Sequence, residues 1–100
     1  MVKVVLEFSG GLDLLFDNQK SISVDVPAED GKEEVTLSRV IFWARDNVLT
    51  SRPELFVQAS SVRPGILVLV NDVDWELSGT LDTIVDQGDR ITFISTLHGG

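Results

Sequence analysis

The chain has 100 residues, 43% of them hydrophobic, and its 16 acidic and 8 basic side chains give a net charge of −8. This length is close to the modal size of one domain and is sufficient for one hydrophobic core. The negative charge disfavours contact with phosphate backbones, so we expect no direct nucleic-acid binding and a basic protein surface as the better partner. The chain has no cysteine, which excludes a disulfide framework, a cysteine-based metal site and a thiol nucleophile.

The amino-terminal segment carries charge at Lys3 and Glu7, too early for the apolar region of a signal peptide. No apolar run approaches the length needed to cross a membrane. We therefore expect a soluble, unsecreted protein without membrane contact, and a monomer by default.

The chain is expected to open with a hairpin of two strands. Apolar side chains alternate with other residues over residues 2–8, and the same period of two recurs at residues 22–26 before Pro27. This period is typical of a strand with one buried face. Gly10 and Gly11 supply a turn between the strands, and residues 28–34 read as an exposed acidic loop.

A helix is predicted after that loop. Its apolar residues recur at three- and four-residue spacing, namely Leu37, Val40, Ile41, Ala44 and Val48, which indicates an amphipathic helix. Thr36 is a plausible N-cap, and Val35 and Val40 have the spacing of a hydrophobic staple. Phe42 and Trp43 fall off the apolar stripe, so we expect residues 50–65 to cover them.

The second half of the chain predicts further strands. Residues 66–70 are a continuous apolar strand, which is either covered on both faces or carries an adhesive outer face. Residues 75–77 are expected to pair back as a short strand, and residues 81–85 to form a brief turn or helix. The last strand spans residues 90–96, with Ile91 and Phe93 toward the core. This order predicts an α+β domain in which one main helix packs against one face of a mixed sheet.

The chain ends in Leu97, His98, Gly99 and Gly100. Glycine lacks a Cβ and can lie flat in a narrow passage, so such a tail can carry its carboxylate into the cleft of an enzyme. We predict one domain over residues 1–96 and a flexible tail over residues 97–100. A frayed terminus is the alternative explanation. His98 lacks a neighbouring nucleophile with a supporting acid, so tail recognition or solvation is expected rather than general base catalysis.

Several segments carry a family resemblance across the whole chain. They are Arg63-Pro64-Gly65 with the strand and Asn71 after it, Asp74-Trp75-Glu76-Leu77-Ser78-Gly79, Gly88-Asp89 and Thr96-Leu97-His98-Gly99-Gly100. With this order of elements, the chain resembles the ubiquitin-related modifier family, which is similar to the sulfur-carrier proteins of molybdopterin and thiamine biosynthesis. The resemblance implies the β-grasp, or ubiquitin-like, fold.

The resemblance also implies a carrier rather than an enzyme. A cytosolic activating enzyme with adenylyltransferase and sulfurtransferase activities would adenylate Gly100 and then replace AMP with sulfur, which leaves a thiocarboxylate. Gly99, His98 and Leu97 would be recognised as the tail. ATP and Mg²⁺ would bind that enzyme, with no cofactor bound by this chain. The sulfur would serve 2-thiolation of the wobble uridine of cytosolic transfer RNA through a separate thiolase, and Gly100 would also be joined to lysines of target proteins. The implied location is the cytoplasm.

Other functions remain open at this point. The main alternative is a noncovalent β-grasp adaptor with an incidental Gly-Gly tail, whereas a small hydrolase is disfavoured because no nucleophile and base pattern is evident. Val5 and Ile94, with one alternating set of residues 66–70, are predicted to form an apolar partner patch. No metal site is expected, because Leu77 stands where the calcium loop suggested by Asp72, Asp74 and Glu76 would need glycine.

Overall fold

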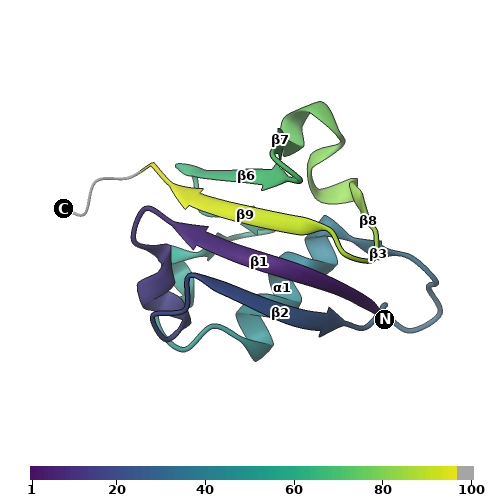
Figure 1. Ribbon diagram of the computed structural model, residues 1–100, viewed down its shortest axis with the longest axis horizontal. Coiled ribbons are helices and arrows are strands. Elements are labelled where there is room, and N and C mark those ends of the chain that lie inside the picture. The colour runs from purple at the N-terminus through teal and green to yellow at the C-terminus, as the bar shows by residue number, and fades with distance from the viewer. Residues whose placement is uncertain (97–100) are drawn as a thin grey trace.

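A computed structural model describes residues 1–96 and contains one main sheet with the helix α1 against one of its faces (Figure 1). The strand order is β2-β1-β9-β6-β7, with β9 parallel to β1 and antiparallel to β6. The strands are β1 (Val2–Ser9), β2 (Ser21–Val26), β6 (Ile66–Val70), β7 (Val73–Asp74) and β9 (Arg90–Ser95). The predicted mixed sheet on one main helix is therefore confirmed.

The helix α1 spans Leu37–Asn47. The side chain of Thr36 accepts a hydrogen bond from the backbone N–H of Arg39 at 3.2 Å, which confirms the predicted N-cap. Val35 and Val40 are both buried. The strand β3 (Val35–Thr36) pairs with β8 (Ile84–Val85), so the start of the helix is tied to the last third of the chain.

The N-cap gives a first testable expectation. Thr36→Ala removes the oxygen that accepts from the Arg39 N–H, and we expect it to lower the free energy of unfolding by about 1 kcal/mol. Urea denaturation followed by circular dichroism measures this loss. Thr36→Ser keeps the acceptor oxygen and should retain most of the free energy of unfolding. Equal losses of this free energy in both variants would contradict the capping role.

Four phenylalanines form the centre of the core between the sheet and α1. Phe8 stacks on Phe16 with ring centroids 3.9 Å apart, and Phe56 meets the edges of Phe16 and Phe93 at 5.1 and 5.3 Å. Phe8 and Phe93 come from β1 and β9, whereas Phe16 ends one short 3-10 helix and Phe56 directly follows another. Ile91 and Phe93 are fully buried, which confirms the predicted core face of the last strand.

Short elements connect the strands. They are the 3-10 helices η1 (Leu12–Phe16), η2 (Pro53–Leu55), η3 (Trp75–Leu77) and η4 (Thr80–Asp82), and the paired strands β4 (Val57–Gln58) and β5 (Ser61–Val62). The apolar residues that follow Gly11 thus form a helical turn that buries Leu12, Leu15 and Phe16. The segment around Phe56 packs on α1 through β4 and β5.

The prediction of a strand at residues 75–77 is wrong. Asn71 and Asp72 adopt positive φ angles of 50° and 69°, so the chain reverses at once and pairing occurs at Val73 and Asp74. The carboxylate of Asp74 then accepts from the N–H of Glu76 at 2.9 Å, which begins η3. The segment predicted as a turn or helix over residues 81–85 contains the end of η4 and the strand β8.

Phe42 and Trp43 are half-buried and pack against the core. The strands β4 and β5, which lie within residues 50–65, contact α1. The guanidinium of Arg45 lies 4.9 Å from the centroid of the Phe42 ring. Part of the Trp43 side chain remains exposed.

Candidate functional site

The described residues end one position after the central strand β9, at Thr96, and we call this position the exit point. Thr96, the last described residue, donates to the carbonyl oxygen of Gly65 from its N–H at 2.9 Å and from its hydroxyl at 2.6 Å. These bonds hold the exit point against the loop before β6. The predicted site residues Leu97, His98, Gly99 and Gly100 lie outside the described residues.

Gly10 borders the same exit point. Its φ is +69°, and a Cβ added there would overlap the backbone carbonyl oxygen of Ser95. Glycine is required at this position for both reasons, because an L side chain is strained at this φ and has no space. The predicted turn glycine therefore also permits close approach of β1 and the end of β9.

The face of the sheet opposite α1 carries a small group of half-exposed apolar side chains. Leu67 and Ile94 are direct partners on β6 and β9. Leu69 follows on the same face of β6, and all three side chains are half-buried. We call these three residues, Leu67, Leu69 and Ile94, the outer apolar patch. It lies beside the end of β9 from which residues 97–100 follow.

Val5 is on the same face but not beside Ile94. Val5 lies opposite Arg90, whereas Ile94 lies opposite Ser9, which separates them by about 13 Å along the strands at the usual rise per residue. Glu7 and Thr92, which face each other between these positions, supply polar groups there. The two predicted patch residues thus share a face and are not in one continuous apolar cluster.

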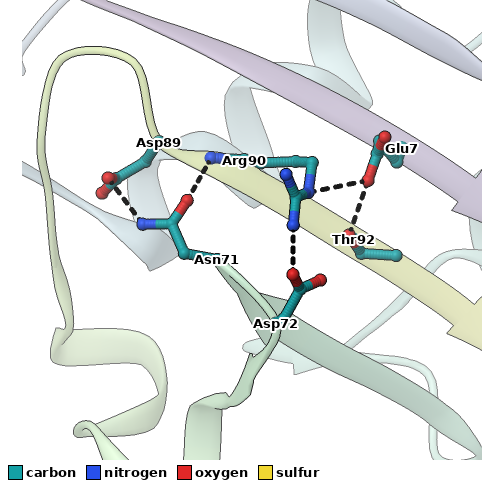
Figure 2. Close-up of polar contacts among 6 residues, drawn as sticks. All are labelled: Glu7, Asn71, Asp72, Asp89, Arg90 and Thr92. Atoms are coloured by element: carbon teal, nitrogen blue, oxygen red, sulfur yellow. Dashed lines mark hydrogen bonds and ion pairs between the residues drawn. The ribbon is translucent and has the colours of Figure 1, made fainter.

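The polar groups beside Val5 form a network centred on Arg90 (Figure 2). Its guanidinium bonds to the carboxylate of Asp72, and its Nε lies 3.1 Å from an oxygen of Glu7. The hydroxyl of Thr92 donates to Glu7 at 3.0 Å. The hydrogen bond to Asp72 and its negative charge raise the pKa of Arg90 above its ordinary value, so the network keeps one positive charge between two carboxylates.

Asn71 connects this network to the turn before β9 (Figure 2). Its side-chain oxygen accepts from the N–H of Arg90 at 2.9 Å, and its amide nitrogen donates to Asp89 at 2.9 Å. The backbone N–H of Asn71 also donates to the carbonyl of Arg90 at 2.8 Å. These bonds fix the reversal after β6 against the start of β9, and they hold Arg90 on the outer face.

Sequence reasoning missed this network. The alternation of β1 and β9 places Glu7 and Thr92 outward, but the sequence does not indicate which residues of two distant strands are opposite each other. Among residues 1–96, no group of three or more His, Cys, Asp or Glu side chains is arranged to hold a metal ion. Within the same part of the chain, no helix is long and apolar enough to cross a bilayer.

Known proteins match the whole chain. The family model described as Urm1 (ubiquitin related modifier) matches residues 3–100. A ubiquitin-related modifier 1 homolog of Chlamydomonas reinhardtii is 60% identical over 100 residues, with all of both chains covered, and homolog 1 of Arabidopsis thaliana is 48% identical over 101 residues, with 99% of this chain and 100% of the relative covered.

A solved structure gives the same result in three dimensions. The solution structure of Urm1 from Trypanosoma brucei superposes with a TM-score of 0.80 at 39% identity and covers 98% of this chain and 95% of its own. The described sheet and helix therefore have the arrangement of that solved structure. The chain belongs to the ubiquitin-related modifier family and has its β-grasp fold.

Proposed function

We propose that this chain is a ubiquitin-like modifier and sulfur carrier whose reactive atom is the carboxyl carbon of Gly100. The observation that carries the proposal is the family match, which extends through residue 100. The position of the last strand supports it, because β9 is central in the sheet and Thr96 is anchored at its end. A carrier needs such a fixed domain from which to present its reactive terminus.

The proposed chemistry explains why an activating partner is required. A carboxylate is a poor electrophile, and its oxygen becomes a leaving group when it displaces pyrophosphate from ATP to form an acyl-adenylate. A persulfide of the partner then attacks the carbonyl carbon and AMP leaves, which gives an acyl disulfide. A second thiol of the partner breaks its S–S bond, so that the thiocarboxylate is released and a disulfide remains on the partner. Donors and Mg²⁺ on the partner stabilise the phosphoryl charge, and this chain supplies the substrate carboxylate and a docking surface.

The products of this activation would have two uses. Sulfur would pass to a thiolase for 2-thiolation of the wobble uridine of cytosolic transfer RNA, and the activated carboxyl would join target lysines through an isopeptide bond. The net charge of −8 supports an indirect route to RNA, because it repels the phosphate backbone. In this proposal the protein acts in the cytoplasm.

The experiment that separates the carrier from a noncovalent adaptor is deletion of Gly100. With the activating enzyme and Mg²⁺, the intact chain should support exchange of labelled pyrophosphate into ATP, and the deleted chain should lose that exchange by at least about a hundredfold because the reacting carboxylate is displaced by one residue. Isothermal titration to the same enzyme without ATP reports docking separately. Equal exchange by both chains would reject activation at Gly100.

The outer apolar patch is the proposed docking surface for the activating enzyme. It lies at the exit of the tail, and half-exposed apolar residues inside a polar rim are typical of interface centres. We expect the double substitution Leu67→Asp and Ile94→Asp to raise KM for the carrier by at least about tenfold, since central interface contacts commonly exceed 1 kcal/mol. Val5→Asp should have a smaller effect because of its distance from this patch.

A matched control places the same two charges elsewhere on the surface. Ser51 and Ser60 are exposed and lie outside the main sheet, and Ser51→Asp with Ser60→Asp should leave KM within about twofold, as expected for surface positions outside an interface. Amide spectra of all variants establish that the sheet is retained. A correctly folded Leu67→Asp and Ile94→Asp variant with unchanged KM would reject the patch as the docking surface.

A further inference from the structure

The strand β2 forms one edge of the main sheet, and the hydrogen-bond pattern of its neighbour shows which of its backbone groups are unpaired. In β1, the N–H of Val5 donates to Asp89 and the C=O of Lys3 accepts from Gly88, both at the β9 side. On the other side, the N–H of Phe8 donates to Lys20. The even-numbered residues of β1 therefore bond to β2, because bonding direction alternates along a strand.

The register identifies the outward groups of β2. Val24 and Ile22 lie opposite Val4 and Leu6 and are the bonded partners, whereas the three alternate residues Ser21, Ser23 and Asp25 direct their N–H and C=O groups away from β1. Among residues 1–96, no segment pairs with this outer edge of β2. The described part of the chain thus leaves a regular edge with three donors and three acceptors.

Between its flanking residues Lys20 and Pro27, this edge lacks most of the features that usually block strand addition. Natural edge strands are commonly protected by lysine, proline, bulges or covering segments. Between Ser21 and Val26 there is no lysine, proline or glycine, and the pairing with β1 is continuous from Ser21 to Val26. Figure 1 shows β2 as the lowest strand of the sheet, without a neighbouring strand on that side.

An apolar surface flanks the edge on the side of α1. The Nε of Arg39 donates to the carbonyl oxygen of Pro27, just after β2, at 2.9 Å. Trp43 is one helical turn farther along the same row of α1, so it lies on the β2 side of the helix. Trp43 and Ile22 are both half-buried and pack on the core, and together they offer partly exposed apolar surface beside the unpaired backbone.

We propose that β2 is a second binding site, which takes an extended peptide segment of a partner protein as an added strand. In the bound peptide segment, alternate side chains would be apolar and contact Trp43 and Ile22. The side chains between them would lie on the face of Ser21, Ser23 and Asp25 and include a Lys or Arg beside Asp25. Strand addition obtains affinity from main-chain bonds and specificity from alternate side chains. The net charge of −8 favours a basic segment and disfavours a second copy of this chain. This site is distinct from the outer apolar patch and needs no activation of Gly100.

Hydrogen exchange of the free protein tests the premise. The amides of Ser21, Ser23 and Asp25 should exchange quickly, and those of Ile22, Val24 and Val26 should be protected at least about tenfold more strongly, since only the latter group is bonded in the sheet. Equal protection of both groups would show that the edge is already covered, which would overturn the proposal.

A peptide titration tests the site itself. The probe is a capped synthetic peptide of alternating valine and lysine, followed by amide chemical shifts of the labelled full chain. We expect saturable downfield shifts of the amide protons of Ser21, Ser23 and Asp25. The same peptide with glutamate in place of lysine should bind more weakly. N-methylation of the alternate probe amides that face β2 should abolish binding. N-methylation of the amides between them, which face away from β2, should leave binding unchanged. Shifts centred on Leu67 and Ile94 would overturn the assignment.

A variant pair provides the matched control. Ser23→Pro removes an N–H that the fold does not use, whereas Ser23→Ala retains that N–H and removes only the hydroxyl. We expect Ser23→Pro to lower the affinity for the probe peptide by at least about tenfold and Ser23→Ala to lower it by less than about twofold, since the main-chain hydrogen bonds carry the interaction. Should Ser23→Pro disturb the sheet, the N-methylated probes decide the outcome. Equal binding by folded Ser23→Pro, or shifts that depend on protein concentration without peptide, would contradict the proposal.

Discussion

Replacement of Phe56 by alanine is expected to lower the free energy of unfolding by about 3–5 kcal/mol, a large part of the 5–15 kcal/mol that is typical of a domain. Phe56 is fully buried and makes edge contacts with the rings of Phe16 and Phe93. Its removal leaves a cavity at the point where η1, β9 and the segment after η2 meet. These elements are held by the core and cannot collapse fully into that space.

Urea denaturation monitored by tryptophan fluorescence measures this effect. Leu77→Ala is the matched control, because it also shortens an apolar side chain but removes one that is 81% exposed. We expect that control to change the free energy by less than about 0.5 kcal/mol, as is usual for surface positions. A loss of less than about 1 kcal/mol for Phe56→Ala would contradict the central position of this ring in the core.

Gly10→Ala is expected to lower the free energy of unfolding by about 3 kcal/mol and to move the exit of the tail. The change combines strain at a positive φ, at about 1 kcal/mol or more, with overlap of the new methyl group and the Ser95 carbonyl, at about 1–3 kcal/mol. Relief of the overlap requires β1 and the end of β9 to separate. The amide signals of Ser95 and Thr96 should therefore shift along with the loss of stability.

Gly11→Ala separates the two causes. Gly11 also has a positive φ, +92°, but nothing lies within 4 Å of a Cβ added there. We expect this control to lower the free energy of unfolding by only about 1 kcal/mol, from backbone strain alone. The amide signals of Ser95 and Thr96 should stay unshifted. Equal losses from both substitutions, without a shift at Ser95, would contradict the close approach at Gly10.

The sequence predicted most of the regular elements because their patterns are local. The alternation of residues 2–8 and the apolar spacing from Leu37 to Ala44 each define one buried face, and the capping oxygen of Thr36 acts within three residues. The error at Trp75–Leu77 has a local cause too: Asn71 and Asp72 both adopt positive φ, which closes the reversal within two residues and shifts pairing to Val73. Propensity did not indicate that these two non-glycine residues would do so.

The outer surface of the sheet was less predictable, because it depends on register between distant segments. Alternation correctly places Val5 and Ile94 on the outer face, but only the pairing of β1 with β9 shows that Glu7 and Thr92 separate them. The contact of Arg90 with Glu7 joins residues 83 positions apart along the chain, and no sequence periodicity encodes it. The same register is needed to find that Ser23 directs its backbone groups outward.

The intact mass of the chain after activation tests the central claim most directly. The protein is incubated with the activating enzyme, ATP, Mg²⁺ and a sulfur donor, with the Gly100-deleted chain as control. The carrier proposal predicts a mass increase that corresponds to sulfur in place of oxygen, confined to the intact chain and mapped by fragmentation to Gly100. An unchanged mass, with the enzyme shown to be active on a known carrier, would contradict sulfur transfer and favour the noncovalent adaptor.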